Sequence, residues 1–246
     1  MAFSKGQPEW GLHLAEDLEK ILMLQDPSTV AAVIIEPVTG SGGVIVPPVG
    51  YLERIREICT KHDVLLIFDE VITGFGRLGD AFAANRFNVR PDIITMAKGL
   101  TSAVIPMSAV AFDTEIYDQL MKGPEAMIEL FHGYTYSGHP VACAAGIATL
   151  DVYQEEGLFD KAKDLEPVFE EALHSLKGLN QVIDIRNIGL MGAIHFGSED
   201  MPATEFAANV FQHCYENDVL VRYSGEFLVL SPSLIASKEH IHQISN

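Results

Sequence analysis

Residues 65–71 read LLIFDEV, four consecutive apolar residues followed by two acidic residues and a valine. A short apolar run of this kind is typical of a strand buried on both faces of a parallel sheet. The carboxyl ends of parallel strands open onto the crevice where α/β proteins bind their ligands. Asp69 stands at such an end, so it is a candidate site residue.

Three roles are open to Asp69 at this point. In a P-loop NTPase, a strand-end aspartate helps to hold Mg²⁺, and a phosphate loop of the form G-x-x-x-x-G-K-S/T must accompany it. In an enzyme that uses pyridoxal phosphate, the aspartate pairs with the protonated pyridine nitrogen, and a lysine must bind the aldehyde. An aspartate at this place can also simply cap the turn after the strand.

Helical and strand patterns alternate on either side of this run. We expect helices over residues 9–25, 51–63 and 139–157, and strands over residues 30–38, 91–97 and 106–112. Residues 123–138 read as a long connection, and Pro140 suits a first helical turn. The alternation predicts an α/β fold with a parallel, doubly wound sheet.

The pattern changes after Gly157. A helical stretch over residues 158–178 is followed by short strand patterns over residues 182–196 and 220–232. The change predicts a large domain over residues 1–157 and a smaller C-terminal α+β domain over residues 158–246, which we expect to be incomplete.

Composition narrows the class of protein. The chain has 246 residues, 48% of them hydrophobic, which is enough to bury a real core. Its 16 basic and 34 acidic residues give a net charge of −18, which argues against a nucleic-acid or anionic-membrane surface. No apolar run reaches the roughly 18 residues of a membrane span, and the first ten residues hold no signal core. We therefore expect a cytoplasmic protein.

Metal and disulfide sites are not indicated either. Cys59, Cys143 and Cys214 lie far apart without paired spacing, and the His240/His242 pair has no further ligand nearby in the sequence. We expect reduced thiols and no metal.

The two chemical alternatives for Asp69 differ in what else the chain must contain. No G-x-x-x-x-G-K-S/T motif occurs, so the NTPase survives only if an upstream loop lies outside this chain. Lys98 ends the apolar run IITMAKG, where a lysine is costly to bury without a purpose. Desolvation would lower its pKa and make the neutral amine a nucleophile toward an aldehyde. Asp69 and Lys98 together favour the cofactor.

Four segments then carry a family resemblance. VAAVIIEPVTGSGGVIVPP, LLIFDEVITGFGRLG, PDIITMAKGLTSAVIPMSAV and HGYTYSGHPVACAAG occur in this order. They resemble the successive signature blocks of class III, fold-type I aminotransferases, and within that class the omega-amino acid:pyruvate, or beta-alanine:pyruvate, transaminases. The resemblance implies part of the large domain of a fold-type I transferase that binds pyridoxal 5'-phosphate, with a mostly parallel sheet, followed by the small C-terminal domain.

The resemblance assigns roles to four residues around the cofactor. Asp69 would keep the pyridine nitrogen protonated, and Val71 would pack against a face of the ring. Lys98 would form the internal aldimine and then shuttle a proton between the substrate and cofactor carbons. Thr135 would donate a hydrogen bond to the cofactor phosphate of the neighbouring subunit, so the family implies a homodimer or a dimer of dimers.

The resemblance also implies that two further residues bind the substrate. Arg222 matches the arginine that binds the substrate carboxylate, for which a planar guanidinium is suited. Glu36 lies at the end of a strand in the same crevice. Arg77 reads as a structural ion-pair residue, and Glu70 points to the other face and receives no chemical role.

The implied activity is transfer of an amino group from an omega-amino acid or amine to pyruvate. Another class III activity (4-aminobutyrate, ornithine or diamine transaminase, or aminomutase) and a non-catalytic fragment are the alternatives. Family members are longer, and the segments that cradle the phosphate precede the part seen here, so we expect a fragment that is inactive alone and exposes apolar surface. Relatives often have glycine at the positions of Ala103 and Ser108.

Overall fold

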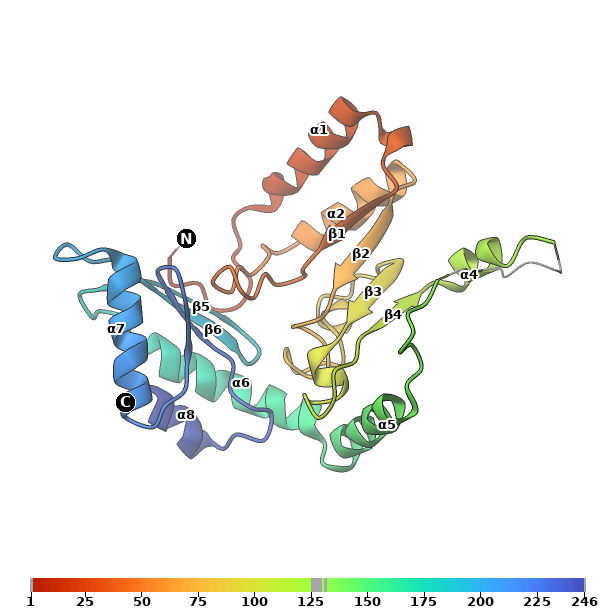
Figure 1. The fold of residues 1–246 in the computed structure, drawn as a ribbon. Coiled ribbons are helices and arrows are strands. Elements are labelled where there is room, and N and C mark those ends of the chain that lie inside the picture. The colour runs from red at the N-terminus through yellow and green to blue at the C-terminus, as the bar shows by residue number, and fades with distance from the viewer. Residues whose placement is uncertain (1, 125–129, 131, 246) are drawn as a thin grey trace.

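The computed structural model describes residues 2–124, 130 and 132–245, and two four-stranded sheets dominate that part of the chain (Figure 1). The strands of the first sheet are β1 (Ala32–Ile35), β2 (Leu65–Asp69), β3 (Ile93–Met96) and β4 (Ala109–Phe112). They lie in the order β1-β2-β3-β4. The strand predicted for the opening run is confirmed, and it lies between two neighbours.

The first sheet is mixed rather than fully parallel. β1, β2 and β3 run parallel, whereas β4 pairs with β3 in the antiparallel direction. A parallel neighbour needs a crossover connection, usually a helix, but residues 97–108 contain only the three-residue 3₁₀ helix η3 (Lys98–Leu100). The chain therefore reverses direction after β3. The expected α/β fold with a mostly parallel sheet is confirmed, and β4 is its one antiparallel strand among the described residues.

Short helices accompany the first sheet. They are η1 (Leu12–Ala15), α1 (Glu16–Gln25), η2 (Pro27–Thr29), α2 (Tyr51–Lys61), α3 (Ala83–Arg86) and α4 (Thr114–Leu120). α2 buries Leu52, Ile55 and Ile58 at the spacing of one helical face. α1 ends just before Asp26, whose positive φ of 62° breaks the helix and whose side chain accepts a hydrogen bond from Ser28 N. The helices predicted near α1 and α2 are thus confirmed, but α4 was not predicted.

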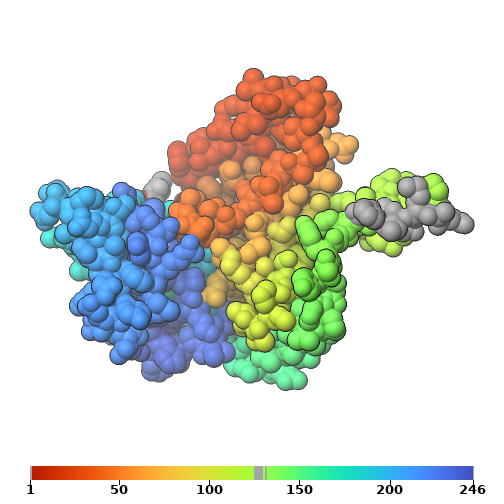
Figure 2. Space-filling model, in the orientation of Figure 1, coloured from red at the N-terminus to blue at the C-terminus, as the bar shows by residue number. Residues whose placement is uncertain are grey.

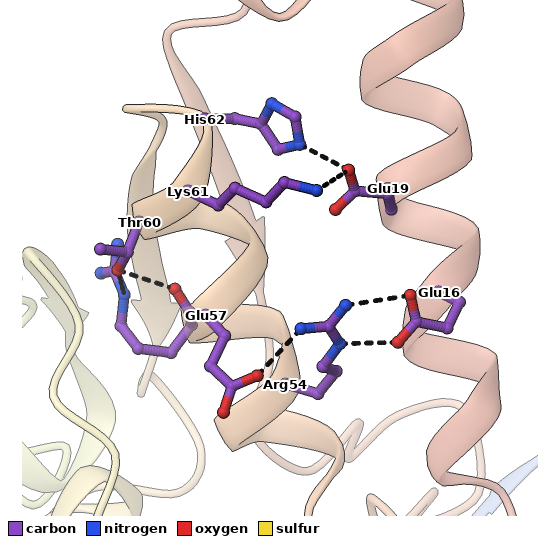
Figure 3. A network of polar contacts seen from close by, with 8 residues as sticks. Glu16, Glu19, Arg54, Glu57, Thr60, Lys61 and His62 are labelled. Carbon is purple, nitrogen blue, oxygen red and sulfur yellow. Dashed lines mark hydrogen bonds and ion pairs between the residues drawn. The ribbon is translucent and has the colours of Figure 1, made fainter.

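Ion pairs join α1 to α2 along their shared side (Figure 3). Arg54 binds both carboxylate oxygens of Glu16, at 2.6 and 3.1 Å, and also reaches Glu57 at 2.9 Å. Lys61 Nζ and His62 Nε2 both lie 2.7 Å from Glu19 Oε1. The hydrogen bond from Arg54 holds the pKa of Glu16 below its ordinary value, and that from Lys61 does the same for Glu19.

Two long helices carry the chain from the first sheet to the second. α5 (Pro140–Glu155) begins with its proline in the first turn, as predicted, and α6 (Leu158–His174) follows at once. Gly157, between them, has a left-handed φ of 59°, which glycine adopts without strain.

The second sheet is antiparallel throughout. Its strands β5 (Val182–Ile188), β6 (Met191–Phe196), β7 (Arg222–Ser224) and β8 (Phe227–Leu230) lie in the order β5-β6-β8-β7. With α6, α7 (Ala203–Glu216) and α8 (Lys238–Ser245) they enclose a core that includes Phe169, Leu173 and Ile241. Phe3 also packs against this core. The first residues of the chain therefore lie against the second sheet, and the boundary between residues 157 and 158 stays a prediction.

A tight junction joins the β5–β6 hairpin to the loop after β2. Leu190 N donates to Arg77 O at 2.9 Å, and Gly189 N donates to Glu166 Oε1 at 2.8 Å. Gly189 has a left-handed φ of 53°, and a Cβ there would lie 2.5 Å from Leu78 Cα. Only glycine permits this approach of two backbones.

Large apolar side chains remain at the surface. Ile34 on β1 and Val110 on β4 are exposed, and α5 exposes Val141, Ile147 and Leu150. α4 projects away from the rest of the molecule (Figure 2). In the described residues, no helix combines the length and the apolar character that crossing a bilayer requires.

Candidate active site

The parallel strands bring their carboxyl ends to one edge of the first sheet. Ile35 of β1 is in register with Phe68 of β2, and Asp69 is in register with Thr95 of β3. Neighbouring strands lie about 4.8 Å apart, so Glu36, Asp69 and the turn at Lys98 meet at that edge. The register thus gathers three of the predicted site residues.

Asp69 is half-buried at the end of β2. Its Oδ1 accepts a hydrogen bond from Val71 N at 3.1 Å. No other hydrogen bond or ion pair between described residues uses this carboxylate, so Oδ2 is available to a further donor. β2 ends at Asp69, so Val71 lies beyond the strand. Val71 is half-buried in the following turn, tied to Asp69 through its own N–H.

Lys98 opens η3 two residues after the end of β3. Its φ of 46° lies in the left-handed region, which costs a non-glycine residue about 1–2 kcal/mol. Such strained conformations cluster at functional sites. The side chain is exposed, contrary to the burial expected from the apolar residues before it, and Lys98 takes part in no ion pair within the described ranges.

The turn at Lys98 rests on an aromatic cluster. A Cβ on Gly99 would lie 2.7 Å from Phe75 Cβ, so the two backbones are close. Tyr153, on α5, donates its hydroxyl to Gly99 O at 2.7 Å, and its ring stacks on Phe75 with centroids 6.2 Å apart. Burial raises the pKa of the Tyr153 hydroxyl above its ordinary value. Further on, Ala103 has a left-handed φ of 64°, which explains physically why glycine suits that position.

Glu36 reaches the same edge, but its carboxylate is already engaged. Its Oε2 accepts a hydrogen bond from Gly40 N at 3.1 Å. A Cβ on Gly40 would lie 2.9 Å from Ile72 Cδ1, so the loop held by Glu36 packs against the residue that follows Val71.

Glu70 was given no role from the sequence, yet it is one of the most constrained side chains near the site. It is fully buried. Its Oε2 accepts from Thr73 Oγ1 at 2.6 Å and from Ala83 N at 2.8 Å, and its Oε1 accepts from Ala84 N at 2.8 Å. Burial raises the pKa of Glu70, and the donors act in the opposite direction. The signal in the sequence was the alternation itself, which turns Glu70 away from Asp69 and into the core.

Arg77 makes different contacts from those expected. Its Nη1 donates to Pro232 O at 2.6 Å and to Leu190 O at 3.2 Å. No carboxylate of a residue that the structure describes pairs with it, so the interpretation of Arg77 as an ion-pair residue is wrong. The guanidinium instead ties the loop after β2 to backbone carbonyls of the second half of the chain.

Two predicted residues lie apart from this edge of the sheet. Thr135 is exposed in a turn closed by the hydrogen bond from Ser137 N to Tyr134 O at 2.9 Å. Arg222 is exposed on the edge strand β7, where it is in register with Val229. Neither contacts Asp69 or Lys98, and their roles stay predictions.

The residues gathered at the edge fit pyridoxal phosphate in two respects. Asp69 Oδ2 is available to accept from a protonated ring nitrogen, and Lys98 Nζ is accessible and bears no carboxylate partner in the described chain. Across that same part of the chain, no three histidine, cysteine or acidic side chains are grouped as metal ligands.

The comparisons with known proteins agree on one family. The model of the family Aminotransferase class-III matches residues 3–246. An omega-aminotransferase of Caulobacter vibrioides is 56% identical over 98% of this chain. A beta-alanine–pyruvate aminotransferase of Pseudomonas aeruginosa is 47% identical over 99% of it. The chain spans 55% of the length of each of these relatives.

The fold agrees as well. The crystal structure of an amine transaminase from an uncultivated Pseudomonas species, in its form with bound pyridoxal phosphate, is 38% identical with a TM-score of 0.89. The match covers 95% of this chain and 54% of that one. The chain therefore belongs to the class III aminotransferases, a family of enzymes that depend on pyridoxal phosphate.

Proposed function

We propose that this chain forms part of a transaminase that moves an amino group from an omega-amino acid or amine to pyruvate. The observation that carries the proposal is the pair at the edge of the first sheet. Asp69 ends β2 with an available carboxylate oxygen, and Lys98, with an available amine, opens the turn that follows the neighbouring parallel strand β3. The names of the two relatives support pyruvate as the acceptor and an omega-amino compound as the donor.

Pyridoxal phosphate, when bound, supplies an aldehyde carbon that exchanges amines and a ring that accepts electrons. Asp69 Oδ2 would accept a hydrogen bond from the protonated ring nitrogen, while Val71 N holds Oδ1 in place. Lys98 Nζ would be the amine that holds the aldehyde and the base that moves a proton during the transfer. Val71 would pack against the ring.

Substrate and phosphate contacts come from more distant residues. Arg222 binds the substrate carboxylate through its planar guanidinium. Glu36 shapes the pocket by holding Gly40. Thr135 reaches the cofactor phosphate of a neighbouring subunit in a cytoplasmic homodimer, or dimer of dimers.

Trapping with borohydride tests the role of Lys98. The lysine amine condenses with the aldehyde of pyridoxal phosphate and releases water; borohydride then delivers hydride to the carbon, and the nitrogen takes a proton from solvent. Peptide mapping should find the label on Lys98 far more than on Lys122, which is exposed and bonds only to Gln119 Oε1 among the described residues. Equal labelling of the two lysines would contradict the proposal, and Lys98→Ala should abolish the specific label.

The donor and acceptor are tested in the whole protein. A panel of omega-amino acids, diamines and simple amines, each with pyruvate or 2-oxoglutarate, separates this activity from the other class III activities. Faster transfer from 4-aminobutyrate to 2-oxoglutarate than from beta-alanine to pyruvate would favour the alternative.

A further inference from the structure

The side chain of Glu70 connects the two ends of the loop formed by residues 70–84. Its backbone N–H donates to Thr95 O at 2.9 Å, which fixes the residue to β3, and its side chain accepts from Ala83 N and Ala84 N at the far end of the loop. Thr73, near the start of the loop, supplies the third donor. One buried carboxylate thus fixes both ends of residues 70–84.

That loop carries the support of the Lys98 turn. Phe75, within it, is buried with a left-handed φ of 57°, and its N–H donates to Ala81 O at 2.6 Å. Its ring meets Phe82 edge to face, with centroids 5.3 Å apart. Since a Cβ on Gly99 would lie only 2.7 Å from Phe75 Cβ, a shift of Phe75 moves the backbone beside Lys98.

We propose that Glu70 is a positioning residue for Lys98. It fixes the loop of residues 70–84 and thereby holds Phe75 against Gly99; this contact in turn keeps Lys98 Nζ in place to bind the aldehyde. The inference rests on the proposed role of Lys98 as the aldehyde-binding lysine.

The chemistry of the carboxylate explains why a glutamate is used. Two oxygens accept three donors, two of them backbone N–H groups that have no alternative partner in the interior. Glutamine has the same shape but only one acceptor atom, so its amide nitrogen would face a donor. Glu70→Gln therefore changes the hydrogen bonding while keeping the volume.

A matched control separates positioning from general stability. Asp184 on β5 is also a mostly buried carboxylate, which accepts from Phe3 N and pairs with Arg186, but it lies in the second sheet. Asp184→Asn should lower the unfolding midpoint without changing the position of Lys98.

The first measurement is borohydride trapping of the 246-residue chain with pyridoxal phosphate, well below each variant's unfolding midpoint. We expect Glu70→Gln to lower labelling of Lys98 relative to Lys122 about tenfold, because loss of a hydrogen bond to a buried charged group is a perturbation of that order. Asp184→Asn should leave the ratio unchanged. Equal ratios in the two variants would overturn the proposal.

The second measurement does not depend on the aldehyde. Leu100 N donates to Ala97 O, and Thr101 N donates to Lys98 O, so amide hydrogen exchange at these positions reports the order of the turn. Glu70→Gln should accelerate their exchange about tenfold, and Asp184→Asn should not. If Lys98 of the wild type carries no label, the proposed binding of the aldehyde by Lys98 is wrong. If amide exchange in Glu70→Gln equals that of the wild type, the proposed positioning by Glu70 is wrong. Should Glu70→Gln not fold, Thr73→Val removes one donor and takes its place in both measurements.

Discussion

At the scale of the residue, the two oxygens of the Asp69 carboxylate have different partners: Oδ1 binds the backbone, and Oδ2 is available to a ligand. Oδ1 is held by Val71 N, and this hydrogen bond fixes the direction of Oδ2. Asparagine could keep the first contact through its amide oxygen but brings no negative charge to the second. The two functions of the side chain can therefore be separated by one substitution.

Asp69→Asn should weaken binding of pyridoxal phosphate about tenfold or more, because a hydrogen bond between two charged partners contributes roughly 1.5–3 kcal/mol. A titration followed by the cofactor's absorbance measures the affinity. Asp63→Asn, in an exposed turn with a left-handed φ of 55° that asparagine tolerates, makes the same change in net charge and should have no effect. Equal affinity in both variants would exclude Asp69 from the site.

The sequence could indicate Asp69 and Lys98, because apolar runs mark strand ends and strand ends mark the crevice. It could not indicate the work of Glu70, whose partners lie three, thirteen and fourteen residues further on in a loop without periodicity. The contacts of Arg77 could not be predicted for a similar reason. Its acceptors are the backbone carbonyls of Leu190 and Pro232, and every residue type has such a carbonyl.

At the scale of the element, the junction of the β5–β6 hairpin with the loop after β2 depends on one missing side chain. Gly189→Ala should destabilise the protein by about 3 kcal/mol, because the new methyl group would press on the backbone of Leu78 in addition to the left-handed strain. Gly225→Ala is the control: its φ of 58° is nearly the same as the 53° of Gly189, but nothing lies within 4 Å of the added Cβ. Chemical denaturation should give a loss of only about 1 kcal/mol there, and equal losses would mean that the junction is not tight.

The pairing of α1 with α2 should depend on acid. Glu16 and Glu19 have lowered pKa values in the folded state, so their contribution to stability is full at neutral pH and is lost as the pH falls below about 4. Amide exchange in α1 should therefore rise in acid before exchange in the second sheet does. Glu16→Gln should reproduce part of this rise at neutral pH, since it removes the bidentate partner of Arg54 (Figure 3). Glu53→Gln, on the exposed side of α2, is the control, and a matching rise there would contradict the account.

Most elements followed from local patterns, since their apolar faces repeat at helical or strand spacing. The direction of β4 did not, because it is decided by the absence of a crossover helix after β3 and not by the residues of the strand. α7 was also missed: the sequence between residues 197 and 219 was left without an element, although Ala203–Glu216 is a full helix.

At the scale of the whole molecule, exposed apolar side chains favour association. Ile147 is 62% exposed on α5, beside the exposed Val141 and Leu150. Ile147→Glu should therefore weaken self-association, measured by sedimentation over a range of protein concentrations. Ile235→Glu, at a residue 69% exposed near α8, should leave it unchanged. Because the chain carries a net charge of −18, added salt should strengthen association of the wild type. A monomer at all concentrations would contradict a dimer built on this face.

The hydroxyl of Tyr153 links helix α5 to the turn that contains Lys98. It donates a hydrogen bond to Gly99 O from the last turn of α5, four residues before Gly157, at which the chain passes into α6. A tilt of α6, and of the sheet that packs on it, would pull on the peptide beside Lys98 without any change at the site itself. Substitutions that alter how α6 sits could thus retune the reactivity of the lysine from a distance, and a search for variants with new donor preferences has reason to include the α5–α6 corner.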